Sequence, residues 1–240
     1  MKHSGYLTTS GAEIYYEQYG SGTPLLILHG NSQSLAVFYP FLRTFLPDFQ
    51  VILMDSRGHG RSRLSVHTAL HGFSTEDMAD DVIALLNHLH LSSVHLLGFS
   101  DGANIGLEIA CKYPERLKTL ICISANASPD GSSAVSALST PKVSLPFQKN
   151  FSVSATSAVC ADKEGQGRFG SIFPRIPAEQ KKKPDFLTRL THRVLRRRNL
   201  TSLLLHSPRL SARKLQTISV PVLLIAGTRD LIKPSHSRWL

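Results

Sequence analysis

The 240-residue chain carries 27 lysines and arginines against 17 aspartates and glutamates, and 42% of its residues are hydrophobic. This length and composition predict one globular domain with a small insertion. The three cysteines have no paired spacing, which argues against a disulfide framework or a zinc site. No apolar run is long enough for a signal peptide or a membrane span, so we expect a soluble, cytoplasmic protein.

The formal net charge of +10 is concentrated in one segment. Residues 175–214 hold twelve basic side chains against Glu179 and Asp185. This segment has no interleaved aromatic residues and no recognisable nucleic-acid module, so we expect a basic helical face in solvent and no nucleic-acid partner. Attraction of nucleic acid or acidic lipid to this segment is the weaker alternative.

The first half of the chain alternates short apolar strands with amphipathic helices. Period-two alternation predicts a hairpin of residues 5–9 and 13–19. Continuous apolar runs predict strands over 25–28, 51–54, 94–97 and 117–123. Helical spacing predicts helices over 34–46, from 75 to about 90 with Ser74 as N-cap, and over 103–112.

The second half differs in composition until a last strand at 222–225. Residues 126–168 are rich in serine, alanine and threonine and predict irregular structure. Basic helices are expected over 186–205 and 211–216, and a further helix begins near Pro234. Buried strands alternating with helices predict a mostly parallel sheet covered on both faces. We therefore divide the chain into a core of residues 1–125, a lid insertion of 126–215, and a core part of 216–240.

The sequence Gly98-Phe99-Ser100-Asp101-Gly102 has the G-x-S-x-G pattern between a predicted strand and a predicted helix. A tight strand-to-helix turn strains the serine backbone, so its near neighbours must be small. The turn places the Ser100 hydroxyl at the positive end of the following helix, where the Asp101 N–H can stabilise an oxyanion. An ordinary glycine-rich turn is the alternative.

Further segments follow in the order typical of one family. They are His29-Gly30-Asn31, the D-x-R-G-x-G-x-S loop of residues 55–62, and the strand and loop of 221–230. With the G-x-S-x-G turn, they make the chain resemble the α/β-hydrolase superfamily of serine esterases and lipases. The resemblance implies Ser100 as nucleophile, the N–H groups of Asn31 and Asp101 as oxyanion hole, and Asp230 as the acid that orients a histidine. The loop of 55–62 is expected to be structural.

The expected histidine is not found. In the family it follows one more strand, two to three dozen residues beyond the acid, whereas this chain ends ten residues after Asp230. The resemblance therefore implies a C-terminally truncated member that lacks the last strand and helix. His236, His192 and His206 are poor replacements, because none lies on the expected loop.

Two functional hypotheses remain open at this point. The first is a serine hydrolase of carboxylic esters or related acyl bonds of a small molecule, impaired by loss of the histidine, with no metal or organic cofactor. The second is an inactive, hydrolase-like or truncated product with only a binding role. Substrate identity and oligomeric state do not follow from the residues.

Overall fold

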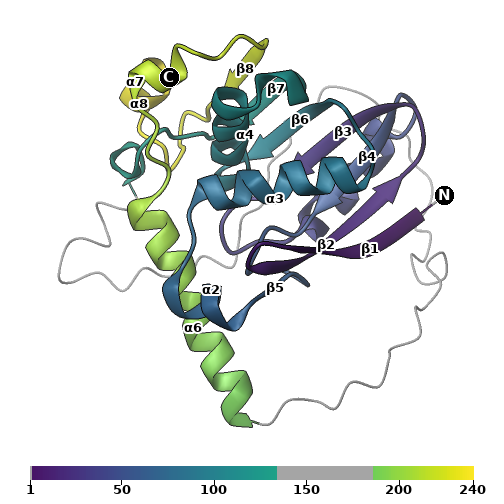
Figure 1. Cartoon of the computed structure of the whole chain (residues 1–240). Coiled ribbons are helices and arrows are strands. Elements are labelled where there is room, and N and C mark those ends of the chain that lie inside the picture. Colours follow the sequence, from purple (N-terminus) through teal and green to yellow (C-terminus); the bar gives the residue numbers. More distant parts are fainter. Residues whose placement is uncertain (1, 134–185) are drawn as a thin grey trace, which may run out of the picture.

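The structure is a computed structural model that describes residues 2–133 and 186–240, and only the backbone at 186–190 and 192. Within these residues, a single sheet of eight strands has helices on both faces (Figure 1). The irregular stretch expected over 126–168 lies almost wholly outside the described residues, as do Cys160 and much of the proposed insertion. The sheet order given below is that of the eight strands within the described residues.

The sheet is antiparallel at one edge and parallel elsewhere. Its strands are β1 (Lys2–Thr9), β2 (Ala12–Tyr19), β3 (Thr23–Leu28), β4 (Phe49–Met54), β5 (Arg63–Leu64), β6 (Val94–Phe99), β7 (Leu117–Ile123) and β8 (Val222–Ile225). They run in the order β1-β2-β4-β3-β6-β7-β8, and β5 pairs with β2. All pairs from β4 to β8 are parallel, so their carboxyl ends meet at one edge. The predicted hairpin and mostly parallel sheet are confirmed.

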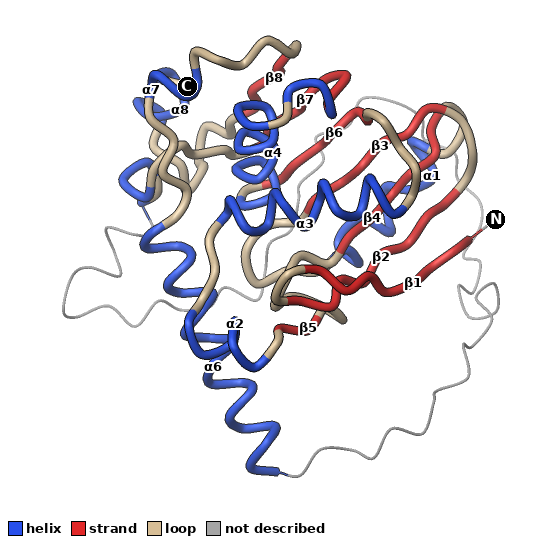
Figure 2. The backbone as a smooth tube through the Cα atoms, viewed as in Figure 1, coloured by secondary structure: helices blue, strands red, loops and turns tan. Residues whose placement is uncertain are grey.

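Helices cover the two faces of the sheet unequally. They are η1 (Leu35–Phe41), α1 (Leu42–Phe45), α2 (Val66–His71), α3 (Thr75–His88), α4 (Asp101–Lys112), η2 (Pro114–Arg116), η3 (Pro129–Gly131), α6 (Phe186–His206), α7 (Ala212–Leu215) and α8 (Pro234–Trp239). Figure 2 shows α3 and α4 in front of the sheet and α1 behind it. The larger core lies under α3 and α4, and a smaller core with Leu35 and Leu42 lies under η1 and α1.

The expected α-helix over 34–46 is partly wrong. Residues 35–41 form a 3₁₀-helix, and only 42–45 are α-helical. Pro40 lies inside this segment and has no N–H to donate, which disfavours a continuous α-helix. The buried stripe was nevertheless predicted, because Leu35 and Leu42 are buried and Phe38 and Phe45 pack against the same core. Strand β5 and helix α2 were not predicted.

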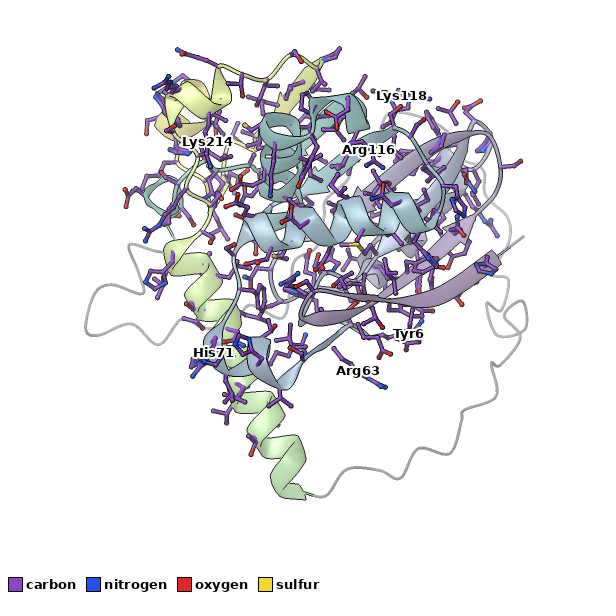
Figure 3. The ribbon with its side chains drawn as sticks, in the orientation of Figure 1. Tyr6, Arg63, His71, Arg116, Lys118 and Lys214 are labelled. Atoms are coloured by element: carbon purple, nitrogen blue, oxygen red, sulfur yellow. The ribbon has the colours of Figure 1, made fainter. Side chains whose placement is uncertain are left out.

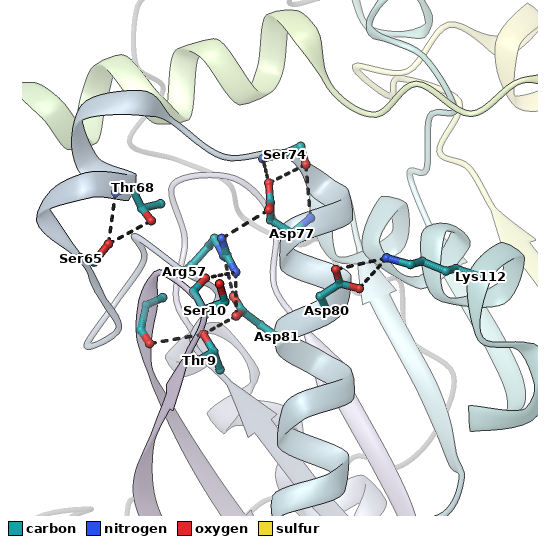
Figure 4. A network of polar contacts seen from close by, with 11 residues as sticks. Thr9, Ser10, Arg57, Ser65, Thr68, Ser74, Asp77, Asp80, Asp81 and Lys112 are labelled. Atoms are coloured by element: carbon teal, nitrogen blue, oxygen red, sulfur yellow. Dashed lines mark hydrogen bonds and ion pairs between the residues drawn. The ribbon is translucent and has the colours of Figure 1, made fainter.

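A buried ion pair fixes the loop after β4 to α3. Arg57 Nε donates to Asp81 Oδ2 at 2.6 Å and Arg57 Nη2 donates to Asp81 Oδ1 at 2.8 Å (Figure 4). The Thr9 hydroxyl donates to the same carboxylate, and the Ser74–Asp77 capping box starts α3 beside it. The loop of residues 55–62 is thereby held rigidly next to the carboxyl edge of the sheet.

Strand β8 lies at the open end of the described sheet. Its four side chains are 37 to 54% exposed, unlike those of the central strands.

Among the described residues, no helix is long and apolar enough to span a membrane. The cytoplasmic location stays a prediction.

Candidate functional site

Ser100 forms the turn between β6 and α4. Its backbone has φ 53° and ψ −118°, a region that residues with a Cβ rarely adopt. The neighbouring glycines make this turn possible, because a Cβ on Gly98 would collide with the Gly102 main chain and one on Gly102 with the Leu28 carbonyl. The Ser100 N–H donates to the Ile123 carbonyl at 2.8 Å. The half-buried serine is thus anchored to the ends of two neighbouring strands.

The loop after β3 lies directly against Ser100. A Cβ built on Gly30 would come within 3.0 Å of the Ser100 Cβ. The Gly30 N–H donates to Gln33 Oε1 at 2.9 Å, and buried His29 Nδ1 donates to the Gly30 carbonyl at 2.8 Å. These contacts fix the backbone that leads into Asn31. The structure therefore brings the Gly30–Asn31 loop and Ser100 together.

Two main-chain N–H groups beside Ser100 are available for a ligand oxygen. Within the described residues, neither the Asn31 N–H nor the Asp101 N–H has a hydrogen-bond acceptor. Asp101 is the first residue of α4, where N–H groups lack an intrahelical partner and carry the positive end of the helix dipole. Donors placed in this way are suited to an anionic oxygen, and their role as an oxyanion hole stays a prediction.

The side chains of the same two residues are bonded to each other. Asn31 Nδ2 donates to Asp101 Oδ2 at 2.9 Å. Burial raises the pKa of the Asp101 carboxyl to about 6, although the hydrogen bond from Asn31 opposes this change. A carboxyl that titrates near pH 6 therefore lies next to the candidate nucleophile.

Asp230 lies at the same carboxyl edge, beyond β8. Its Oδ2 accepts hydrogen bonds from the Ser124 hydroxyl at 2.6 Å and from the Gly227 N–H at 3.2 Å. Its Oδ1 accepts one from the Ile232 N–H at 3.0 Å. The carboxylate is thus oriented by three donors, and its role as the acid of a triad stays a prediction.

No histidine of the described residues is bonded to Ser100 or Asp230. His236 Nε2 instead accepts a hydrogen bond from the Ala127 N–H at 3.0 Å, and burial lowers the pKa of its imidazole. Exposed His206 donates through Nδ1 to the Ser202 carbonyl within α6. The side chain of His192 lies outside the described residues.

The loop of residues 55–62 is bonded to the segment that follows β3. The Asp55 carboxylate accepts the Leu35 and Arg61 N–H groups, each at 2.8 Å. Buried His59 donates through Nδ1 to the Arg57 carbonyl, and burial together with neighbouring His29 lowers its pKa to about 3. A histidine with this pKa is neutral and only weakly basic at pH 7.

The part of the chain that the structure describes has no cluster of three or more histidine, cysteine or acidic side chains suited to a metal.

Two contacts of the site were not predicted from the sequence. One is the bond from the Ser124 hydroxyl to Asp230, because no motif in the sequence marks Ser124. The other is the bond from Asn31 Nδ2 to the Leu200 carbonyl at 3.2 Å, which leaves no signature because any residue has a carbonyl.

Comparisons with known proteins identify the fold family of the chain. A family model described as the alpha/beta hydrolase fold matches residues 23–155. An uncharacterized hydrolase of Bacillus subtilis, YraK, is 31% identical over 119 residues, or 50% of this chain and 43% of that protein. The 2-(acetamidomethylene)succinate hydrolase of Mesorhizobium japonicum is 34% identical over 104 residues, or 43% of this chain and 36% of that protein.

A solved structure extends the likeness to the fold as a whole. A hydrolase from Pseudomonas aeruginosa PA01 matches with a TM-score of 0.64 and 23% identity, and the match covers 98% of this chain and 84% of that one. The two curated relatives are matched over less than half of their own length.

Proposed function

The chain belongs to the α/β-hydrolase fold family, and from this premise we propose that it is a serine hydrolase of carboxylic esters or related acyl bonds of small molecules. The observation that carries the proposal is the strained Ser100 backbone between β6 and α4, beside two N–H groups that have no acceptor among the described residues. Strain of this kind is kept only where the surrounding structure enforces it, and it is typical of nucleophile turns.

In the proposed reaction the Ser100 oxygen attacks the acyl carbon and passes its proton to a base. The Asn31 and Asp101 N–H groups bind the resulting oxyanion. When the oxyanion collapses, the ester bond breaks, the base gives its proton to the leaving oxygen, and an alcohol departs while an acyl-serine remains. Water then attacks the acyl carbon, releases the acid and returns the proton to Ser100. Asp230 would orient a histidine base. The described residues place no imidazole there, so we expect slow turnover, roughly a thousandfold above water.

We also propose the division into core residues 1–125, a lid insertion of 126–215, and core residues 216–240. Its support is that β8 pairs in parallel with β7, so the chain returns to the neighbouring sheet position after the insertion.

A fluorophosphonate probe and 4-nitrophenyl acetate test the proposal. We expect the probe to label the wild type at Ser100, as read by peptide mass spectrometry, and the ester to be cleaved slowly. Ser100→Ala should abolish both, whereas Ser92→Ala, at an exposed serine, should leave both unchanged. Labelling that persists in Ser100→Ala would refute the assignment.

The second candidate is a binding protein that uses the site without turnover. The hydrogen bond from Ala127 to His236 favours it, because this imidazole is occupied elsewhere. A folded wild type that is neither labelled nor active, with cooperative thermal unfolding as control, would support this candidate over the hydrolase.

A further inference from the structure

The Asn31 side chain contacts three parts of the molecule at once. Its Nδ2 donates to Asp101 Oδ2 on α4 at 2.9 Å and to the Leu200 carbonyl on α6 at 3.2 Å. Its Oδ1 accepts the Ser32 hydroxyl at 2.8 Å. A carboxamide NH₂ group has two hydrogens, and here each has one acceptor. Both donor positions of the side chain are therefore used, one by α4 and the other by α6.

This orientation of the amide is set by chemistry. Rotation by 180° would point Oδ1 at the ionised Asp101 carboxylate and at the Leu200 carbonyl, and both of these are acceptors. Neither a serine, which has one donor, nor an aspartate, which has none when ionised, could replace Asn31 in both bonds. The pairing thus requires an amide at this position.

Helix α6 is held at the same point by the two residues before Leu200. Buried Asn199 donates through Nδ2 to the Ala69 carbonyl at 3.0 Å, and Arg198 donates to the Ala69 and Leu70 carbonyls. These are terminal carbonyls of α2, whose last residue, His71, lies beside α6 (Figure 3). Residues 198–200 therefore join α2 to the loop that carries Asn31.

From these contacts we propose that the Asn31 side chain is a positioning group that couples the docking of α6 to the oxyanion-binding N–H groups. This inference rests on the proposed function. With α6 docked, the shared amide fixes Asn31 relative to Asp101, so their two main-chain N–H groups keep a constant separation. When α6 leaves, one bond of the amide is lost and the Gly30–Asn31 loop loosens. The docking of α6 against Asn31 thus sets the reactivity of Ser100.

Hydrogen–deuterium exchange tests the coupling in both directions in the full chain. Asn199→Ala removes the buried side-chain bond of Asn199 to α2, weakens the docking of α6 and leaves residues 29–35 untouched. We expect exchange of the bonded Gly30, Gln33 and Leu35 N–H groups to rise about fivefold in this variant. By reciprocity, Asn31→Ala should raise exchange across residues 199–206 by a similar factor, although it keeps its own main-chain N–H.

Thr201→Ala is the matched control, because Thr201 is an exposed α6 residue next to Leu200. It should leave exchange at residues 29–35 unchanged. Faster exchange confined to α6 in Asn199→Ala, with residues 29–35 as in the wild type, would overturn the coupling. So would equal effects of Asn199→Ala and Thr201→Ala.

Fluorophosphonate labelling separates this inference from the proposed function. If both hold, Asn199→Ala and Asn31→Ala label Ser100 about fivefold more slowly, and Thr201→Ala labels at the wild-type rate. Reciprocal exchange in a protein that is never labelled would support the coupling and count against the hydrolase. Labelling that is equally fast in all four proteins would overturn the coupling and leave the hydrolase standing.

Discussion

The Ser124 hydroxyl donates to Asp230 Oδ2 at 2.6 Å and so ties the loop after β8 to the end of β7. Because Ser124 N–H also donates to the Ile225 carbonyl at 2.8 Å, one residue holds both the strand and its loop. The orientation of the Asp230 carboxylate is therefore fixed by a residue at the end of β7. A carboxylate held in this way is suited to orienting a second group.

Ser124→Ala removes the side-chain bond without changing the backbone. We expect the free energy of unfolding to fall by about 1.5 to 3 kcal/mol, the usual net value of a hydrogen bond to a charged group. Urea denaturation at pH 7 measures this loss. Ser92→Ala, at an exposed serine, should be neutral, and an equal loss in both variants would contradict the role of Ser124.

Asp101→Asn should stabilise the protein at neutral pH. The pKa of Asp101 rises from its ordinary value of 3.8 to about 6 on burial, so ionisation opposes folding. The cost is absent below pH 3.8, grows between 3.8 and 6, and reaches about 3 kcal/mol above pH 6. The variant should therefore unfold at a higher temperature at pH 8, and the difference should vanish near pH 3.5. Asp48→Asn, at an exposed carboxyl, should lack this pH dependence.

Glu17 should have the opposite pH dependence. It is buried on β2 between donors, namely the Tyr15, Tyr19 and Tyr39 hydroxyls, Lys2 and Arg61. Burial alone would raise the pKa of Glu17, but the hydrogen bonds from the three tyrosines and Lys2 lower it below its ordinary value. Its contribution is present above the unfolded pKa near 4.5 and is lost as pH falls through the folded pKa.

Glu17→Gln tests this arrangement. The change removes the buried charge and leaves the phenols and cations without a carboxylate, so we expect a loss of about 2 to 3 kcal/mol at pH 7. The difference from the wild type should shrink below pH 4. Denaturant titrations at several pH values provide the measurement, with the more exposed Glu13→Gln as control. A constant difference at all pH values would refute the charge argument.

The strands other than β5, the Ser100 turn and the cap at Ser74 could be predicted because their signals are local: apolar runs, small neighbours, and a serine three residues before an acid. Two kinds of feature could not. Residues 35–41 form a 3₁₀-helix, which winds more tightly than the predicted α-helix. The apolar spacing could not show this, because it carries no information on the N–H donor that Pro40 lacks. The bond from Asn31 to Leu200 joins residues 169 positions apart through a carbonyl, which every residue has.

We predict that the protein self-associates through the edge of strand β8. It pairs with β7 on one side, its other edge has no partner among the described residues, and all four side chains are apolar. An edge of this kind can pair with another chain unless a charge blocks it. Leu223, which is 54% exposed, is the place for that charge.

Leu223→Lys should lower the associated fraction of the protein in sedimentation velocity at increasing concentration. Lysine at this position puts a charge on the strand where a second copy would pair, while the pairing with β7 is kept. Val37→Lys adds the same charge at an exposed residue of η1, a helix that contacts β3 and not β8, and should leave association as in the wild type. If both variants lower association equally, net charge is the cause, and the β8 edge is not the contact.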